Sequence, residues 1–164
     1  KVGEAVNLVV QDGKEAIYIE RLDTKQRVRL NTAIGRRTPL YAGACSGAIL
    51  AFQPQYEREQ YLEQIELKSI ASGTITDKER LRILLEESRK TGFTVSHSEL
   101  ENYISTVAAP IFDYKGYIIA GISVAGLEVN YEKELLPPLV KKVKCAALEI
   151  SRKFGYTDKH RCLS

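Results

Sequence analysis

The feature that most constrains the fold is a strand–loop–strand pattern in the second half of the chain. Apolar and β-branched residues fill positions 104–112 and 117–125, and the loop between them, Asp113-Tyr-Lys-Gly116, ends in glycine. Two such runs joined by a short loop with glycine are typical of a β-hairpin. The sequence therefore predicts a pair of neighbouring antiparallel strands.

The second strand of this hairpin has two different faces. Alternation places on one face apolar side chains that can pack against helices, namely Ile118, Ala120, Ile122 and Val124. The other face carries Ile119 and then only small side chains with one hydroxyl, namely Gly121, Ser123 and Ala125. Small residues on a sheet face either let another element approach closely or leave an open pocket. Both interpretations stay open on the sequence alone.

Another hairpin is predicted near the start of the chain. Residues 5–10 and 16–22 are rich in apolar and β-branched residues, and Gln11-Asp-Gly13 between them is a turn signal. Residues 27–30 are expected to form a third, shorter strand whose Arg27 and Arg29 share one solvated face.

A loop rich in small residues follows at positions 38–47. Its proline and glycines should interrupt regular structure before Ala44, and a short apolar helix should follow over 48–52. Amides that open a helix have no intrahelical partner and can bind an anion. The alternative is a tight turn into a buried helix, and the Gly43-x-x-x-Gly47 spacing matches no phosphate-binding loop. Spacing alone supports the two interpretations equally.

Three further helices are predicted, and with the hairpins they give an α+β domain with helices mainly on one side of an antiparallel sheet. Pro54 should end the short apolar helix, and a charged helix should follow over 56–66. Thr76-Asp-Lys-Glu79 is a capping box, and Gly92 is a typical helix end. The last helix should run over 138–154, with an apolar stripe of Leu139, Val143, Ala146, Ala147, Ile150 and Phe154.

Composition places the chain among ordinary globular domains. It has 164 residues, 44% hydrophobic and 27% charged, and a formal net charge of +3, too balanced to mark a nucleic-acid surface. The longest apolar stretch, residues 117–127, is too short to span a membrane. The odd number of cysteines, three at wide spacing, argues against a disulfide framework and favours a cytoplasmic location. Cys145 is expected to be a small core or interface residue.

The sequence carries little that points to catalysis. It has only two histidines, His97 and His160, and neither a nucleophile elbow nor a Cys-x-x-Cys motif occurs. His160 and Cys162 are two ligands in a polar tail, which do not make a metal site, and no cofactor is expected. A reactive pair of His97 and Cys45 stays an alternative, but a binding module is the better physical interpretation.

Several segments together resemble the IclR-type transcriptional regulators. Thr38-Pro-Leu-Tyr-Ala-Gly-Ala-Cys-Ser-Gly-Ala-Ile-Leu-Ala51 is similar to that family's loop–helix segment. Val107-Ala-Ala-Pro-Ile-Phe-Asp113, with Gly116 and Ala120-Gly-Ile-Ser-Val-Ala-Gly126, is similar to its most recognisable stretch. The resemblance extends over nearly the whole chain, to about residue 156.

The resemblance implies a GAF-like effector-binding domain over residues 1–156, followed by a polar tail at 157–164. It implies a small-molecule-sensing and oligomerisation domain of a bacterial regulator, a repressor, that forms homodimers or homotetramers. An amino-terminal winged helix-turn-helix domain would precede Lys1 in the intact regulator, so operator DNA would be contacted only through that missing domain. No membrane partner and no enzymatic activity are implied.

The resemblance also implies an effector site. In family members that bind small oxo-acids, backbone amides of the loop hold the ligand, and these positions match Gly43 and Ala44 here. The side-chain positions match Ser96, Thr106, Ser123 and Ala125, where such members usually carry Asp, Cys, Ser and Ser. Only the serine at 123 is kept, which argues against a glyoxylate- or pyruvate-like ligand. The expected effector is a small organic acid or an aromatic metabolite in a roomier, mildly polar pocket.

The hairpin geometry supports this site independently, because Thr106 and Ser123 lie on neighbouring strands and can point into one pocket. One alternative is a constitutive dimerisation module with a vestigial pocket. The other is an enzyme that uses His97 or Cys45.

Overall fold

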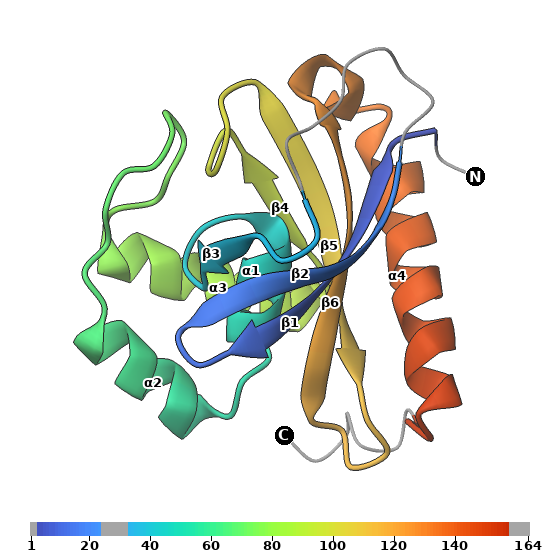
Figure 1. The fold of residues 1–164 in the computed structure, drawn as a ribbon, viewed down its shortest axis with the longest axis horizontal. Coiled ribbons are helices and arrows are strands. Elements are labelled where there is room, and N and C mark those ends of the chain that lie inside the picture. Colours follow the sequence, from blue (N-terminus) through green and yellow to red (C-terminus); the bar gives the residue numbers. More distant parts are fainter. Residues whose placement is uncertain (1–2, 24–32, 158–164) are drawn as a thin grey trace.

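A six-stranded antiparallel sheet forms the centre of the domain, in the order β3-β2-β1-β6-β5-β4. The computed structural model describes residues 3–23 and 33–157 (Figure 1). The strands are β1 (Ala5–Asp12), β2 (Glu15–Leu22), β3 (Arg37–Pro39), β4 (Thr94–His97), β5 (Ile104–Phe112) and β6 (Ile118–Leu127). The helices are α1 (Ala44–Ala51), α2 (Gln55–Gln64), α3 (Lys78–Thr91), the 3-10 helix η1 (Glu128–Tyr131) and α4 (Leu136–Lys153).

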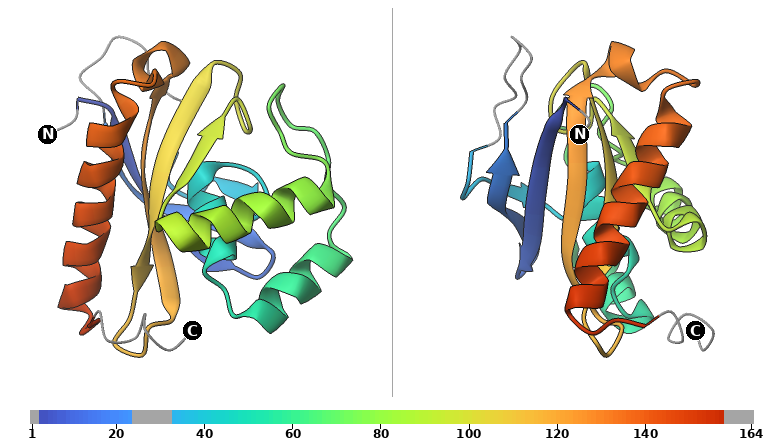
Figure 2. Two further views of the ribbon diagram at one scale, coloured as in Figure 1. Left: turned by 180° about the vertical axis from the view of Figure 1, so that it is seen from behind. Right: turned by 90° about the vertical axis from the view of Figure 1, so that its right-hand side faces the viewer.

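Helices cover both faces of the sheet, and each side has its own core. Helices α1, α2 and α3 lie on one side, where Ile49, Leu62 and Leu85 join one apolar cluster (Figure 2). Helix α4 lies on the other side, where Val143 and Ala147 join a second cluster. The predicted α+β class with an antiparallel sheet flanked by helices is therefore confirmed. No helix among the described residues has the length and apolar character needed to cross a membrane.

The β5–β6 hairpin forms as predicted, apart from a bulge near its loop. The Asp113 carboxylate accepts hydrogen bonds from the amides of Lys115 and Tyr117, and Gly116 adopts a φ of 81° that favours glycine. The register shifts so that Phe112 pairs with Ile118, while Ile111 pairs with Ala120. This bulge puts Ile118 in the α1-side core and Ile119 in the α4-side core. The predicted faces are wrong for these two residues.

The third strand is not where the sequence placed it. The predicted strand at 27–30 lies outside the described residues, and the strand that pairs with β2 is β3. The sequence reasoning was wrong to expect that Pro39 would exclude regular structure here. Strand β3 is an edge strand and pairs only with β2 in the described sheet. Its proline therefore takes no hydrogen bond away from a second neighbouring strand.

Two helix starts also differ from the prediction. Helix α1 begins at Ala44 and includes the small-residue run with Gly47, so it is longer than the expected 48–52 segment. Helix α3 is capped by Asp77, whose carboxylate accepts the Arg80 amide at 2.7 Å, instead of by the Thr76 hydroxyl. Its end at Gly92, with φ 82° in the left-handed region, agrees with the prediction.

Helix α4 keeps most of its predicted apolar stripe, with two corrections. Phe154 is 55% exposed and is not a core residue. Cys145, predicted to be a core or interface residue, is exposed in this chain, which excludes the core of this domain for it. Ser151 is buried instead, because its hydroxyl donates to the Ala147 carbonyl and accepts the Phe112 amide of β5. That hydroxyl ties the helix to the sheet through hydrogen bonds that an apolar-stripe argument does not consider.

The small-residue face of β6 allows α1 to approach the sheet closely. A Cβ on Gly121 would lie 3.0 Å from both the carbonyl oxygen and the Sγ of Cys45 in α1. Gly47 within α1 has open space where a Cβ would stand. The close packing therefore requires a glycine at position 121, whereas no neighbouring atom requires one at position 47.

We expect Gly121→Ala to lower the free energy of unfolding by about 1–3 kcal/mol, because the added methyl group overpacks the α1–sheet contact. Gly47→Ala should raise it by about 0.5–1 kcal/mol, because alanine favours the helix and meets nothing. Urea denaturation of both variants checks this matched pair. Equal effects of the two substitutions would contradict the close-approach role of Gly121.

Candidate functional site

The loop before α1 presents its amides to one end of the sheet. Gly43 caps the helix with φ 87° and ψ 149°, a backbone conformation that favours glycine. Its N–H donates to Oε2 of Glu99 at 2.7 Å, and the Ala44 N–H donates to Oγ of Ser96 at 3.0 Å. The Thr94 hydroxyl bonds the Ala44 carbonyl, so β4 fixes the start of the helix. Both amides that could receive a ligand are thus held by the protein's own side chains.

The six predicted site residues line one cavity of about 30 Å3 between this loop and the sheet. Ser96, Thr106 and Ala125 stand directly opposite one another across β4, β5 and β6. Ser123 lies two residues from Ala125 on the same face, and the loop supplies Gly43 and Ala44 above them. The structure therefore brings all six together.

Asn7 on β1 is a further polar residue in this cavity that the sequence reasoning missed. It stands directly opposite Ser123 and is only 2% exposed. Its Oδ1 has no hydrogen-bond partner among the described residues. A polar residue at an inward position, between the buried Ala5 and Val9, was the sequence signal that could have found it.

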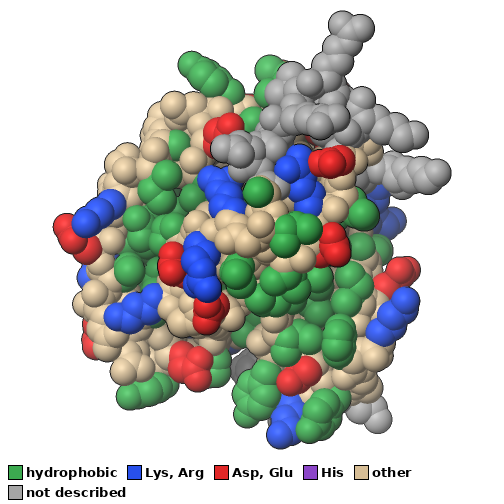
Figure 3. Space-filling view, viewed as in Figure 1, with side chains coloured by type: hydrophobic (Ala, Val, Ile, Leu, Met, Phe, Trp, Pro, Cys, Tyr) green, Lys and Arg blue, Asp and Glu red, His purple; other side chains and the backbone are tan. Residues whose placement is uncertain are grey.

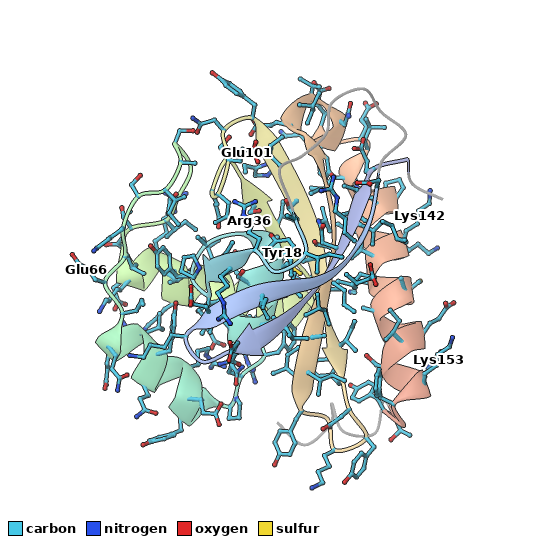
Figure 4. The ribbon with its side chains drawn as sticks, viewed as in Figure 1. Tyr18, Arg36, Glu66, Glu101, Lys142 and Lys153 are labelled. Carbon is cyan, nitrogen blue, oxygen red and sulfur yellow. The ribbon has the colours of Figure 1, made fainter. Side chains whose placement is uncertain are left out.

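A charged side of the cavity was missed as well. Glu99, Leu100 and Glu101 come from the segment between β4 and β5, which the sequence shows only as a polar stretch. Arg36 lies opposite, with its guanidinium carbon 5.9 Å from the centre of the Tyr18 ring (Figure 4). These groups come from loops without regular periodicity, so spacing could not place them.

Burial dominates the electrostatics of Glu99. Loss of solvent raises the pKa of its carboxyl to about 7, although the Gly43 hydrogen bond and the charge of Arg80 act in the opposite direction. Near neutral pH this carboxyl therefore exchanges between its charged and neutral forms. It is the one group lining this cavity, among those described, with a pKa raised into the physiological range.

The structure does not bring Cys45 and His97 together as a reactive pair. Burial raises the pKa of the Cys45 thiol to about 12, against a lowering effect of the Ser123 hydrogen bond, so the thiol stays protonated. His97 follows Ser96 on β4, points to the opposite face and has its Nδ1 2.6 Å from Oγ of Ser105. Among the described residues no group of three or more His, Cys, Asp or Glu could hold a metal ion.

A larger hollow lies elsewhere on the molecule. A groove of about 620 Å3 runs between α4 and the β4–β5 side of the sheet, with apolar lining residues such as Phe93, Pro110, Val140 and Leu148. The smaller cavity is nevertheless the better candidate site. Polar side chains from four strands and the amides of a helix start converge there, which is what orients a small ligand.

Comparison with known proteins identifies the family of this chain. The family model for the bacterial transcriptional regulator IclR C-terminal region matches residues 1–152. The HTH-type transcriptional regulator KipR of Bacillus subtilis is 55% identical over 157 residues, which are 96% of this chain and 63% of KipR. The HTH-type transcriptional repressor AllR of Escherichia coli is 29% identical over 153 residues, 93% of this chain and 56% of AllR. The chain thus spans less than two thirds of the length of these relatives.

Two solved structures share the fold. The IclR protein of Thermotoga maritima has a TM-score of 0.91 at 38% identity and covers 94% of this chain and 63% of its own. An IclR homologue of Microbacterium hydrocarbonoxydans, complexed with 4-hydroxybenzoate, has a TM-score of 0.82 at 27% identity. The match covers 93% of this chain and 61% of the homologue. The matched region is a regulatory domain, not an enzyme. The chain therefore belongs to the IclR family of bacterial transcriptional regulators and corresponds to the C-terminal domain of its members.

Proposed function

We propose that this domain, residues 1–156 with a polar tail at 157–164, senses a small organic acid or an aromatic metabolite in the cavity below the Gly43–Ala44 loop. The domain assembles as a homodimer or homotetramer in the cytoplasm. Operator DNA is bound by a part of the regulator that this chain does not contain. The name of AllR as a repressor supports repression as the regulatory direction.

The convergence of polar groups on the cavity carries the proposal. A buried polar atom without a partner costs about 1–3 kcal/mol, so stability does not explain the Oδ1 of Asn7, which has no partner among the residues that the structure describes. Thr106 and Ser123 add hydroxyls on the same sheet face, and the Ser123 hydroxyl also forms a hydrogen bond with the Cys45 thiol of α1. The 4-hydroxybenzoate bound to the Microbacterium homologue supports a small ligand of this chemical kind.

The size of the cavity connects binding to regulation. A volume of about 30 Å3 holds roughly two water molecules, so an effector must enlarge the cavity as it binds. A ligand shifts a conformational equilibrium only as far as it binds one state better than the other. A cavity enlarged by a ligand would be such a difference between states. Helix α1 forms one side of it and also packs on the central strands β5 and β6.

A thermal-shift screen of small carboxylates and aromatic acids, followed by calorimetry, tests the site. We expect a binder to raise the melting temperature of the wild type, and Thr106→Val to weaken that binder about 3–10-fold through the loss of one hydrogen bond. Thr157→Val makes the same chemical change at an exposed residue outside the cavity and should bind like the wild type.

Each contrary result has a definite meaning. A binder that Thr106→Val and the bulkier Ser123→Phe leave unaffected would place the ligand elsewhere. Failure of a broad screen, together with a dimer that does not depend on concentration, would favour the alternative of a dimerisation module with a vestigial pocket.

An uncovered apolar sheet face supports the oligomeric part of the proposal. Helix α4 packs against β5 and β6, and in the described part of the chain no helix packs over the same side of β1 and β2. Apolar side chains gather there between β1 and α4 (Figure 3). The half-buried or exposed apolar residues of this face are Val6, Leu8, Val10, Ile17, Leu22 and Ile122. Contiguous apolar patches of this kind mark association surfaces.

Size-exclusion chromatography with light scattering tests this surface. We expect the wild-type chain to elute at twice its 18.4 kDa or more, and Leu8→Lys to elute as a monomer because a buried charge opposes association. Ile83→Lys places the same charge on an exposed residue of α3 and should keep the wild-type mass. A monomeric wild type, or an oligomer in Leu8→Lys, would contradict the assignment of this face.

A further inference from the structure

We propose that the Glu99 carboxylate is an internal occupant of the effector cavity, and that an acidic effector binds by taking its place on the Gly43 amide. The inference rests on the proposed ligand-binding role of this cavity. It adds the residue that competes with the ligand and the chemical group, a carboxylate or similar anion, for which they compete.

The contact between Glu99 and the loop has the form of an anion site. The 2.7 Å distance between the Gly43 nitrogen and Oε2 of Glu99 is that of a charge-assisted hydrogen bond. The amide belongs to the capping residue of α1, where backbone donors lack intrahelical partners. The Oδ1 of Asn7, buried in the same cavity and without a partner in the described part of the chain, independently indicates a place for a ligand.

Leu100 completes the filling of the cavity. Its Cδ1 lies only 2.6 Å from the position that a Cβ on Gly43 would take, so the leucine packs directly on the glycine. Glu99 occupies the place of a ligand's polar group, and Leu100 occupies the space that the rest of the ligand would fill. The small remaining volume of about 30 Å3 follows from these two side chains.

The segment that carries both residues is bounded by two non-glycine residues with left-handed backbone, Ser98 at φ 52° and Tyr103 at φ 65°. It is attached to the neighbouring loop by a few hydrogen bonds. The Thr74 hydroxyl donates to the Glu99 carbonyl at 2.6 Å, and the Ser72 amide donates to Oδ1 of Asn102 at 2.8 Å. No helix or strand has to break for Glu99 and Leu100 to leave the cavity together.

Charge makes Glu99 an occupant that is easy to displace. Burial raises the pKa of its carboxyl to about 7, so the ionised form is costly in place, and a second carboxylate beside it would be repelled. Arg80 of α3 attracts the ionised form. The other charged or titratable groups that line the two cavities touching Glu99 are Tyr18, Arg36, Tyr41, Cys45, Glu87 and Glu101.

The pH dependence of stability tests whether Glu99 is held in this desolvated position. Because its folded-state pKa lies above the ordinary value, the folded state binds the proton more tightly, and the contribution of Glu99 to stability falls as pH rises from about 4.5 to about 7. We expect the urea midpoint of Glu99→Gln to match the wild type at pH 4.5 and to exceed it at pH 8. A wild type that gains stability relative to Glu99→Gln over this range would overturn the proposal.

Acetate, the probe for the competing anion, tests displacement directly. Amide resonances of Gly43 and Ala44 are followed by nuclear magnetic resonance at pH 8 while acetate is added. We expect saturable shifts in Glu99→Ala and at least tenfold weaker binding in the wild type. Glu63→Ala removes the same charge from an exposed position in α2 and should behave like the wild type.

Equal shifts in the wild type and Glu99→Ala, or no shift in Glu99→Ala, would overturn the proposal. If the variant does not fold, Glu99→Gln replaces it, since its neutral amide should also yield the Gly43 position to acetate more readily than the wild type. A screened effector that binds the cavity with the same affinity in Glu99→Ala would overturn this inference while the proposed sensing function stands.

Discussion

The close approach of α1 to the centre of the sheet determines where everything else lies. Gly121 leaves room for the Cys45 backbone, and this contact fixes the height of the helix above β6. The Thr38 and Ser46 hydroxyls, 2.9 Å apart and buried, tie the helix to β3. Because α1 lies so close to the sheet, the loop that precedes it covers this end of the strands and encloses the cavity. A bulkier residue at 121 would displace the loop and change the site, although it lies outside the cavity lining.

The sequence predicted the regular parts of this arrangement because they follow periodicity. Alternation in β6 separated the two sheet faces from Ala120 onward, and the loop signals located the hairpins. The prediction failed where contacts between distant segments decide. The bulge at Ile119 depends on pairing with β5, and the Asp77 cap prevails over Thr76 through local geometry that a motif does not encode.

The candidate site, like the fold, was predicted where periodicity applies and missed where it does not. Resemblance and strand geometry together selected six residues that line one cavity. Asn7 was missed because a polar residue in an apolar strand gives a weak signal, and Glu99 was missed because irregular segments carry no periodicity. The acid that family members of the oxo-acid class usually carry at position 96 is a serine here, and its hydroxyl bonds the Ala44 amide. The carboxylate that bonds the loop of this cavity comes from Glu99, three residues later along the chain.

Both edges of the sheet are short, since β3 has three residues and β4 has four. Such edges offer few free backbone groups, and Pro39 removes a donor from one of them. The sheet is thereby protected against edge-to-edge pairing with other sheets, the usual hazard of an antiparallel sheet with free edges. The proposed association face and the cavity lie on opposite sides of the sheet, so contacts between copies at that face would leave the cavity side uncovered by a partner.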